Sequence, residues 1–183
     1  MKRILIDNGW LFREGPPPSM YLEIERDKKS RKVDLPHDFS IERAPKKECP
    51  EGDACGYLES GIGTYMRYFE VAGDMVAGKI LLELDGAYCN AEVSVNGHLV
   101  GIHPNGYMPW RFDLSRYINA GKNRIGVTVG NMGRNTRWYS GTGIYRHASL
   151  RTGGEVHLTP DPVFLRTESI SGRNAHILAE VFA

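Results

Sequence analysis

The sequence has 183 residues, enough for one substantial domain, and its 23 Lys and Arg residues are balanced by 22 Asp and Glu residues. The formal net charge of +1 gives no electrostatic reason to expect a nucleic acid or an anionic membrane surface as a partner. No apolar run approaches the roughly 20 residues of a membrane span, and residues 4–6 are too short for the core of a signal peptide, so we expect a cytoplasmic protein.

The first third of the chain is predicted to be rich in loops. Residues 16–60 contain six prolines, and within them residues 33–36 are expected to form an edge strand. The spacing of Cys49 and Cys55 matches no common zinc pattern, and no second pair follows. We therefore expect these two residues and Cys89 to be free thiols, as in a reducing compartment, and we expect no metal and no cofactor.

The middle of the chain carries short strand patterns separated by turn signals. Strands are predicted at 63–71, 80–84, 91–95, 99–100, 125–129, 149–151 and 156–158. Asn96-Gly97 joins two of them and favours a type I′ hairpin turn. Together with 21 glycines and 10 prolines, this spacing is typical of an all-β sandwich or jelly roll.

An aromatic loop follows the predicted hairpin. We expect Tyr107, Trp110 and Phe112 to bury against the core and to hold this loop rigid. The alternative is that Trp110 is an exposed platform for a sugar.

A single helical turn is predicted after this loop. Leu114, Tyr117 and Ile118 have helical spacing, with Asp113 as the N-cap and Gly121 as the C-terminal cap.

The C-terminal part of the chain predicts a hairpin of its own. Residues 159–162 contain two prolines and form a stiff connection, and strands are expected at 163–168 and 175–182. A lone two-stranded hairpin is marginally stable in water. We therefore expect these residues to begin a second domain of which this chain holds only a part.

Five stretches stand out in order along the chain. They are "VDLPHDFSIE" (33–42), "GYLESGIGTYMRYFEV" (56–71), "LLELDGAYCNAEVSVNGHLVG" (81–101), "NGYMPWRFDLSRYINAGKNRIGVTVGN" (105–131) and "RWYSGTGIYRHASL" (137–150). In series they resemble the N-terminal sugar-binding domain of family 2 glycoside hydrolases, the group of β-galactosidases, β-glucuronidases and β-mannosidases. The last stretch most resembles the β-galactosidase branch.

This resemblance implies a domain organisation. Residues 1–155 would form a jelly-roll or galactose-binding-like β-sandwich, and residues 156–183 a linker and the first strands of an immunoglobulin-like domain. A TIM barrel with two catalytic glutamates would lie outside this chain. Retaining glycosidases need two carboxyls about 5–5.5 Å apart, and no pair in this sequence has a spacing that forces such proximity. We therefore expect no catalytic residue in this chain and no activity from it alone.

The resemblance also implies candidate substrate-binding residues, because loops of the first domain shape the site for the terminal sugar. Arg137 offers a fork of donors for sugar hydroxyls, and the Trp138 indole offers an apolar face for a pyranose. Glu59 in the "GYLESGIG" loop is a further candidate. The alternative for Arg137 is a structural role, with its guanidinium stacked on Trp138.

Together these features predict the N-terminal accessory domain of a retaining exo-glycosidase that hydrolyses terminal β-galactosides. Its partners would be the carbohydrate, its own catalytic barrel and, if the protein is a homo-oligomer, further copies of itself. Three alternatives stay open: the same domain of a β-glucuronidase or β-mannosidase, a free-standing carbohydrate-binding module, and an adhesion or scaffold sandwich. The hairpin at 163–182 discriminates against a module, which would end near residue 153.

Overall fold

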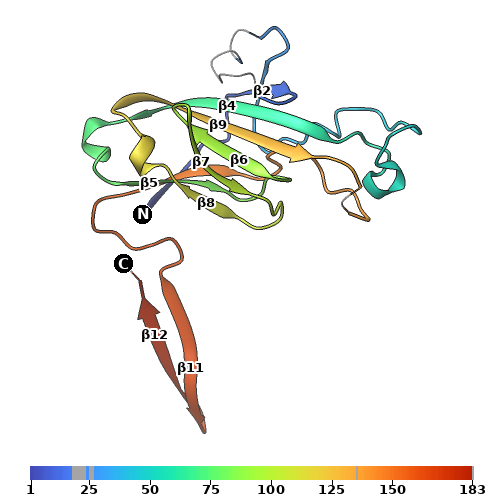
Figure 1. The fold of residues 1–183 in the computed structure, drawn as a ribbon. Coiled ribbons are helices and arrows are strands. Elements are labelled where there is room, and N and C mark those ends of the chain that lie inside the picture. Colours follow the sequence, from blue (N-terminus) through green and yellow to red (C-terminus); the bar gives the residue numbers. More distant parts are fainter. Residues whose placement is uncertain (18–23, 25–26, 135, 183) are drawn as a thin grey trace.

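Two β-sheets lie face to face in the computed structural model, and a separate β-hairpin projects away from them (Figure 1). The structure describes residues 1–17, 24, 27–134 and 136–182. The all-β sandwich predicted from the sequence is confirmed. The described helical segments are short 3₁₀ turns, none of which has the length and apolar character of a membrane-crossing helix. They are η2 (Gly52–Cys55), η3 (Gly73–Met75) and η4 (Ser115–Tyr117).

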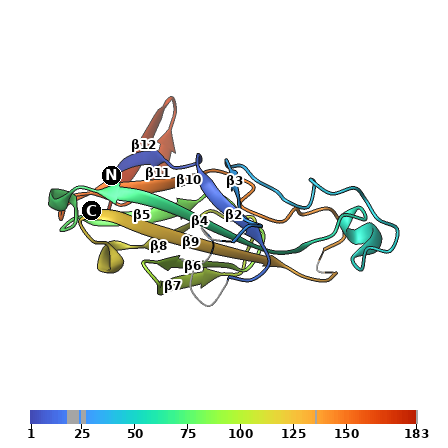
Figure 2. The same ribbon diagram turned by 90° about the horizontal axis from the view of Figure 1, so that it is seen from above.

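The smaller sheet is antiparallel, with the strand order β1-β10-β5-β8. Its strands are β1 (Lys2–Leu5), β5 (Lys79–Leu84), β8 (Trp110–Asp113) and β10 (Ala148–Gly153). The larger sheet has the order β3-β2-β4-β9-β6-β7. Its strands are β2 (Trp10–Glu14), β3 (Arg31–Val33), β4 (Gly61–Val71), β6 (Ala91–Val95), β7 (His98–His103) and β9 (Gly121–Asn131). The long pair β4 and β9 runs the length of the sandwich and pairs from Gly61 with Asn131 to Val71 with Gly121 (Figure 2).

The core lies between the two sheets and is built from alternate residues of their strands. Trp10, Tyr65, Val93 and Val127 of the larger sheet have no exposed surface, and neither has Leu82 of the smaller sheet. Every second side chain of a strand points to the same face, so these residues point inward from their strands. The buried indole of Trp10 donates its N–H to the carbonyl of Ile6 at 2.7 Å, so the indole N–H keeps a hydrogen-bond partner.

The predicted hairpin turn is confirmed, because Asn96 and Gly97 both have positive φ, at 51° and 90°. The short helical turn predicted after it is present as η4 (Ser115–Tyr117), but Gly121 begins β9 instead of capping the turn. Asp113 does accept the backbone N–H of Ser115 at 3.1 Å, which is the interaction a capping carboxylate makes.

Some strands differ from the sequence-based expectation. Residues 156–158 form no strand, because the chain leaves the sheet after Gly153, and Val156 is 91% exposed. The sequence analysis did not predict β1, β2 and β8. The edge strand expected at 33–36 is present as β3, which begins two residues earlier, at Arg31. The three cysteines are free thiols, as expected.

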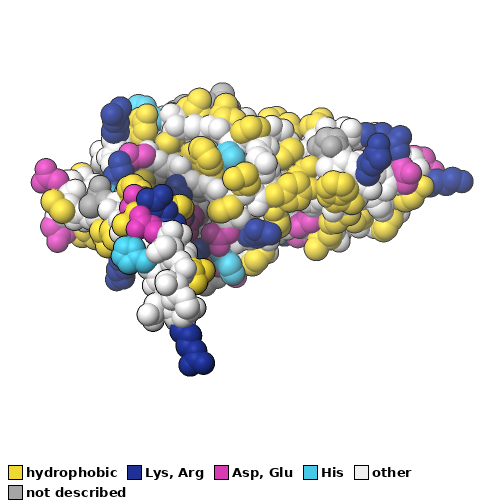
Figure 3. All heavy atoms as spheres, turned by 90° about the horizontal axis from the view of Figure 1, so that it is seen from below, with side chains coloured by type: hydrophobic (Ala, Val, Ile, Leu, Met, Phe, Trp, Pro, Cys, Tyr) yellow, Lys and Arg dark blue, Asp and Glu magenta, His cyan; other side chains and the backbone are white. Residues whose placement is uncertain are grey.

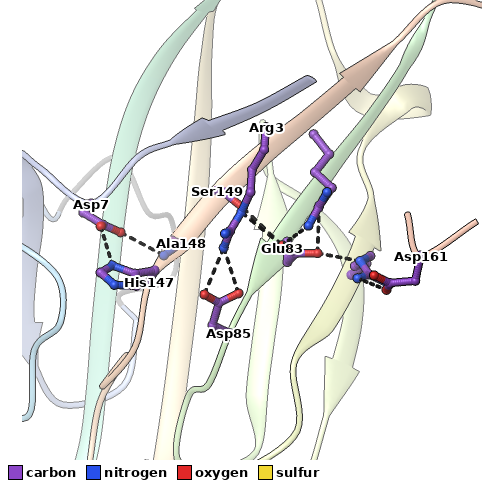
Figure 4. Close-up of polar contacts among 10 residues, drawn as sticks. Arg3, Asp7, Glu83, Asp85, His147, Ala148, Ser149 and Asp161 are labelled. Atoms are coloured by element: carbon purple, nitrogen blue, oxygen red, sulfur yellow. Dashed lines mark hydrogen bonds and ion pairs between the residues drawn. The ribbon is translucent and has the colours of Figure 1, made fainter. Parts of the chain in front are cut away.

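A carboxylate on β5 links the strands of the smaller sheet on its outer face. Glu83 is 2% exposed and pairs with Arg111 of β8 at 2.5 Å, Arg151 of β10 at 2.8 Å and Arg3 of β1 at 3.3 Å (Figure 4). Burial by itself would raise the pKa of Glu83, but hydrogen bonds from Arg151 and Arg111 outweigh it and lower the pKa. Arg111 also reaches Asp161 in the connection to the hairpin, at 2.5 Å.

The projecting hairpin consists of β11 (Val163–Ser171) and β12 (Asn174–Val181), which form a two-stranded sheet of their own. The two strands predicted for this part of the sequence are therefore confirmed. Val163, Leu165, Ile177 and Val181 are all more than half exposed.

Candidate functional site

One end of the sandwich gathers the loops that carry the candidate residues. The register places the start of β4 beside the end of β9, the start of β6 beside the end of β7, and the start of β8 and of β10 beside the end of β5. The connections at this end span residues 34–60, 85–90, 104–109 and 132–147. Hydrophobic side chains gather on the face seen in Figure 3, between the projecting hairpin and this loop end.

Trp138 presents its indole at this end and is 59% exposed. Its Nε1–H donates to the hydroxyl of Tyr107 at 3.0 Å, so the polar edge of the indole is occupied while much of the ring stays open to solvent. The Tyr107 ring in turn lies against Tyr88, with ring centroids 5.2 Å apart. Side chains from three separate loops therefore set the orientation of this tryptophan.

The burial expected for the aromatic loop is only partly right. Phe112 is 4% exposed and lies in the core, but Tyr107 is 44% and Trp110 45% exposed. The register of β8 differs for the two residues: Phe112 pairs with Leu82 in the middle of β5, whereas Trp110 pairs with Leu84, the last residue of β5. The alternative of an exposed Trp110 is the one the structure shows.

Asp38 holds the segment that follows Trp138. Its carboxylate accepts the Tyr139 hydroxyl at 2.5 Å and the backbone N–H groups of Ser40 and Thr142, each at 3.0 Å. Gly141 has a φ of 78°, and a Cβ there would lie 2.7 Å from Asp38 Oδ2. Burial and the Asp38 carboxylate raise the pKa of Tyr139, so its phenol stays protonated as the donor.

The base of the same loop is fixed by a buried amide. Asn131, at the end of β9, is 1% exposed and donates from Nδ2 to the carbonyl of Gly141 at 2.9 Å and to Oγ1 of Thr142 at 3.2 Å. Ser40 Oγ reaches the same threonine oxygen at 2.9 Å. Asn131 is thus joined to Gly141 and Thr142, and the segment that follows Trp138 has a fixed support.

Arg137 is exposed, and within the described part of the chain its guanidinium makes no hydrogen bond or ion pair. It lines a depression of about 330 Å³ together with Asp53, Arg134 and Thr136. None of the cation–π contacts found among the described residues joins Arg137 to Trp138, so the alternative of a stacked, purely structural arginine is not what the structure shows.

Glu59 lies in a different electrostatic setting from the other two candidates. Its carboxylate pairs with Lys46 at 2.9 Å and with Arg43 at 3.7 Å. Among the described residues no hydrogen bond or ion pair joins it to Arg137 or Trp138. Glu59 is thus engaged by neighbouring cations, whereas the other two side chains are open to solvent.

Residues 50–154 match the family described as glycosyl hydrolases family 2, sugar binding domain, which is more than half of the chain. The chain belongs to this family. A β-galactosidase of Bacteroides ovatus is 39% identical over 148 residues, which are 79% of this chain and 17% of that protein. A β-glucuronidase of Bacteroides fragilis is 24% identical over 192 residues, or 97% of this chain and 25% of that protein.

The fold agrees with solved family 2 structures. A crystal structure of a glycosyl hydrolase family 2 member from Bacteroides cellulosilyticus superimposes with a TM-score of 0.86 at 30% identity, covering 98% of this chain and 24% of that one. The family resemblance found in the sequence is therefore confirmed. The chain spans a quarter or less of the length of these relatives.

In this family 2 sugar-binding domain, Asp38, Tyr107 and Tyr139 were not predicted from the sequence as supports of Trp138. Asp38 lies in the "PHDF" stretch and Tyr139 directly follows Trp138, so each was within a quoted block. Nothing local connects them, because 101 positions separate the two residues in the chain. Within the described residues, no group of three or more His, Cys, Asp or Glu side chains is arranged to hold a metal ion.

Proposed function

We propose that this chain is the N-terminal accessory domain of a retaining exo-glycosidase that hydrolyses terminal β-galactosides. The observation that supports this most is the exposed indole of Trp138, held by Tyr107 and backed by the Asp38 network, in a domain of the sugar-binding family. In this proposal the loop end completes the substrate pocket of a catalytic TIM barrel that lies outside the chain.

The proposed roles follow from side-chain chemistry. The open face of Trp138 would pack against the C–H face of the terminal pyranose, and the unpaired guanidinium of Arg137 would donate to its hydroxyls. The engaged carboxylate of Glu59 makes it the weakest of the three candidates, since Lys46 and Arg43 would compete with a sugar for it. The acid and the nucleophile would be two barrel carboxylates, so the chain alone would be inactive.

The domain division is part of the same proposal: a sugar-binding domain over 1–155, and over 156–183 a linker with the first strands of an immunoglobulin-like domain. It is supported by the separate sheet of β11 and β12. Val163, Leu165, Ile177 and Val181 on these strands are more than half exposed, as expected of residues that await further strands. A cytoplasmic location and a homo-oligomer belong to this proposal as well.

The experiment is steady-state kinetics of Trp138→Ala and Arg137→Ala in the longer protein, with nitrophenyl β-galactoside as substrate. Loss of a sugar contact should lower kcat/KM by roughly ten- to a hundredfold, the equivalent of about 1.5–3 kcal/mol. Met132→Ala is the matched control, because Met132 is 66% exposed on the same loop but makes none of the contacts described above. If both variants keep kcat/KM within about twofold of the parent while melting several degrees lower, these residues are structural and the proposal for them is wrong.

A second candidate function is the same domain of a β-glucuronidase. It is favoured by the guanidinium of Arg137, which pairs with no described residue, since arginine binds carboxylates through two parallel hydrogen bonds. The same variant separates the two functions. If the parent prefers nitrophenyl β-glucuronide and Arg137→Ala loses that preference, the uronate is the substrate and the galactoside proposal is wrong.

A further inference from the structure

A cleft lies on the open edge of the sandwich and begins at Trp110, which follows the aromatic loop. Strands β7 and β8 are the edge strands of the two sheets, and a space of about 410 Å³ lies between them. Its size is within the range of small-molecule sites. The residues that matter for what it could bind are Val100, Ile102, Trp110, Arg116 and Tyr117.

One wall of the cleft is aromatic and rigid. The Trp110 ring stacks on His103 with centroids 4.4 Å apart and only 7° between the planes. His103 stacks on one face of the indole, yet Trp110 is still 45% exposed, so part of the ring surface is open to a ligand. Ile102, 59% exposed, continues this apolar surface.

The polar groups of the cleft lie at its other end. Arg116 is exposed, and neither its guanidinium nor the hydroxyl of Tyr117 makes a hydrogen bond or ion pair with any residue in the described part of the chain. The Tyr117 ring is held by stacking on His98, with centroids 5.5 Å apart. Arg111 also lines the cleft, but its charge is already matched by Glu83 and Asp161. The cleft therefore combines one flat apolar face with unpaired donors.

This combination fits a sugar better than a protein strand. An indole face accepts the C–H surface of one pyranose, and a guanidinium fork with a phenol can bind the hydroxyls of a further unit of the same oligosaccharide. Strand addition along β7 is disfavoured, because the register of β7 shifts opposite Val93 and Ser94 and the bulge interrupts the regular edge.

We propose that the cleft between β7 and β8 is a second carbohydrate site, which binds a segment of a neutral oligosaccharide with one pyranose ring on Trp110 and the hydroxyls of a further unit on Arg116 and Tyr117. This site is separate from the terminal-sugar surface around Trp138 and does not depend on the proposed enzyme activity. It would hold a part of the glycan that is not cleaved.

The test is a titration of the 183-residue chain with β-1,4-galactotetraose, followed by the chemical shifts of the tryptophan indole N–H groups. Trp110→Ala should weaken binding by about tenfold, the equivalent of about 1.4 kcal/mol. Arg116→Ala should also weaken it, and Trp110→Phe should retain most of the affinity because an aromatic face remains. Leu99→Ala is the control: Leu99 is 54% exposed on β7 but does not line the cleft.

Several results would overturn the proposal. The tetraose could fail to bind at its highest soluble concentration, or bind the parent and a folded Trp110→Ala variant equally. If Trp138→Ala loses binding and Trp110→Ala does not, the tetraose binds at the surface around Trp138 and the cleft site is refuted. This outcome would not refute the proposed role of Trp138 in catalysis. A concentration-dependent dimer in sedimentation that Trp110→Ala abolishes would identify the cleft as an interface between copies.

Discussion

Glu83→Gln tests how much the charge network of the smaller sheet contributes to stability. The substitution keeps the side-chain volume but removes the charge that faces Arg3, Arg111 and Arg151. Breaking a fully buried ion pair costs about 3–5 kcal/mol, whereas an exposed pair contributes about 0.2–1 kcal/mol. The Glu83 side chain is 3% exposed, but those of its partners are 40%, 33% and 21% exposed, so water screens part of the interaction. We therefore expect a loss of about 2 kcal/mol.

For a chain of this length a loss of that size lowers Tm by about 4–8 °C, which differential scanning calorimetry at neutral pH measures readily. Glu14→Gln is the matched control, because that carboxylate is 59% exposed and, among the described residues, pairs only with Arg43. The control should change Tm by less than a third as much. If the two variants melt together, the buried network contributes nothing beyond an ordinary surface pair, and the argument from burial is wrong.

The same variant predicts a pH dependence. The pKa of Glu83 is lowered from its ordinary value of 4.5. A carboxylate with a lowered pKa in the folded state stabilises the protein above its unfolded pKa, and this stabilisation is lost as the pH falls through the folded pKa. The Tm difference between the parent and Glu83→Gln should therefore be full near neutral pH and should shrink below pH 4.5. A Tm difference that stays constant down to pH 3 would contradict the assignment of this stabilisation to the ionised Glu83 carboxylate.

Three further predictions concern the backbone, the thiols and activity. Gly106→Ala should lower Tm by several degrees, because the new Cβ would lie 2.1 Å from the Tyr88 ring. The control Gly73→Ala, whose Cβ would have nothing within 4 Å, should leave Tm nearly unchanged. Equal Tm values for the two variants would contradict the packing argument. Thiol titration of denatured, unreduced protein should count all three cysteines, and a count of one would reveal a disulfide. The chain alone should release no nitrophenol from nitrophenyl β-galactoside above the rate without protein, and turnover that survives repurification would show that the chain holds its own catalytic carboxyls.

Much of the fold could be predicted from the sequence because it depends on local physical preferences. The Asn96-Gly97 turn needs two residues that tolerate positive φ, and no distant contact is required to recognise them. Strand β9 has Ile125, Val127 and Val129 in alternation with Gly126 and Thr128, a pattern that one core-facing side produces. The five quoted blocks likewise identified the family, since a family pattern is a property of the sequence alone.

Other features were decided only by the tertiary structure. Whether Trp110 or Phe112 enters the core depends on the register of β8 against β5, which no residue of the loop encodes. Asp38 meets Tyr139 across 101 positions, and Glu83 meets Arg3 across 80. Such contacts form only when the two sheets close on each other, because hydrogen bonds and ion pairs act over a few ångströms and take their partners from whichever strands the packing brings together. The support of Trp138, and with it the candidate sugar surface, is therefore a product of the folded sandwich.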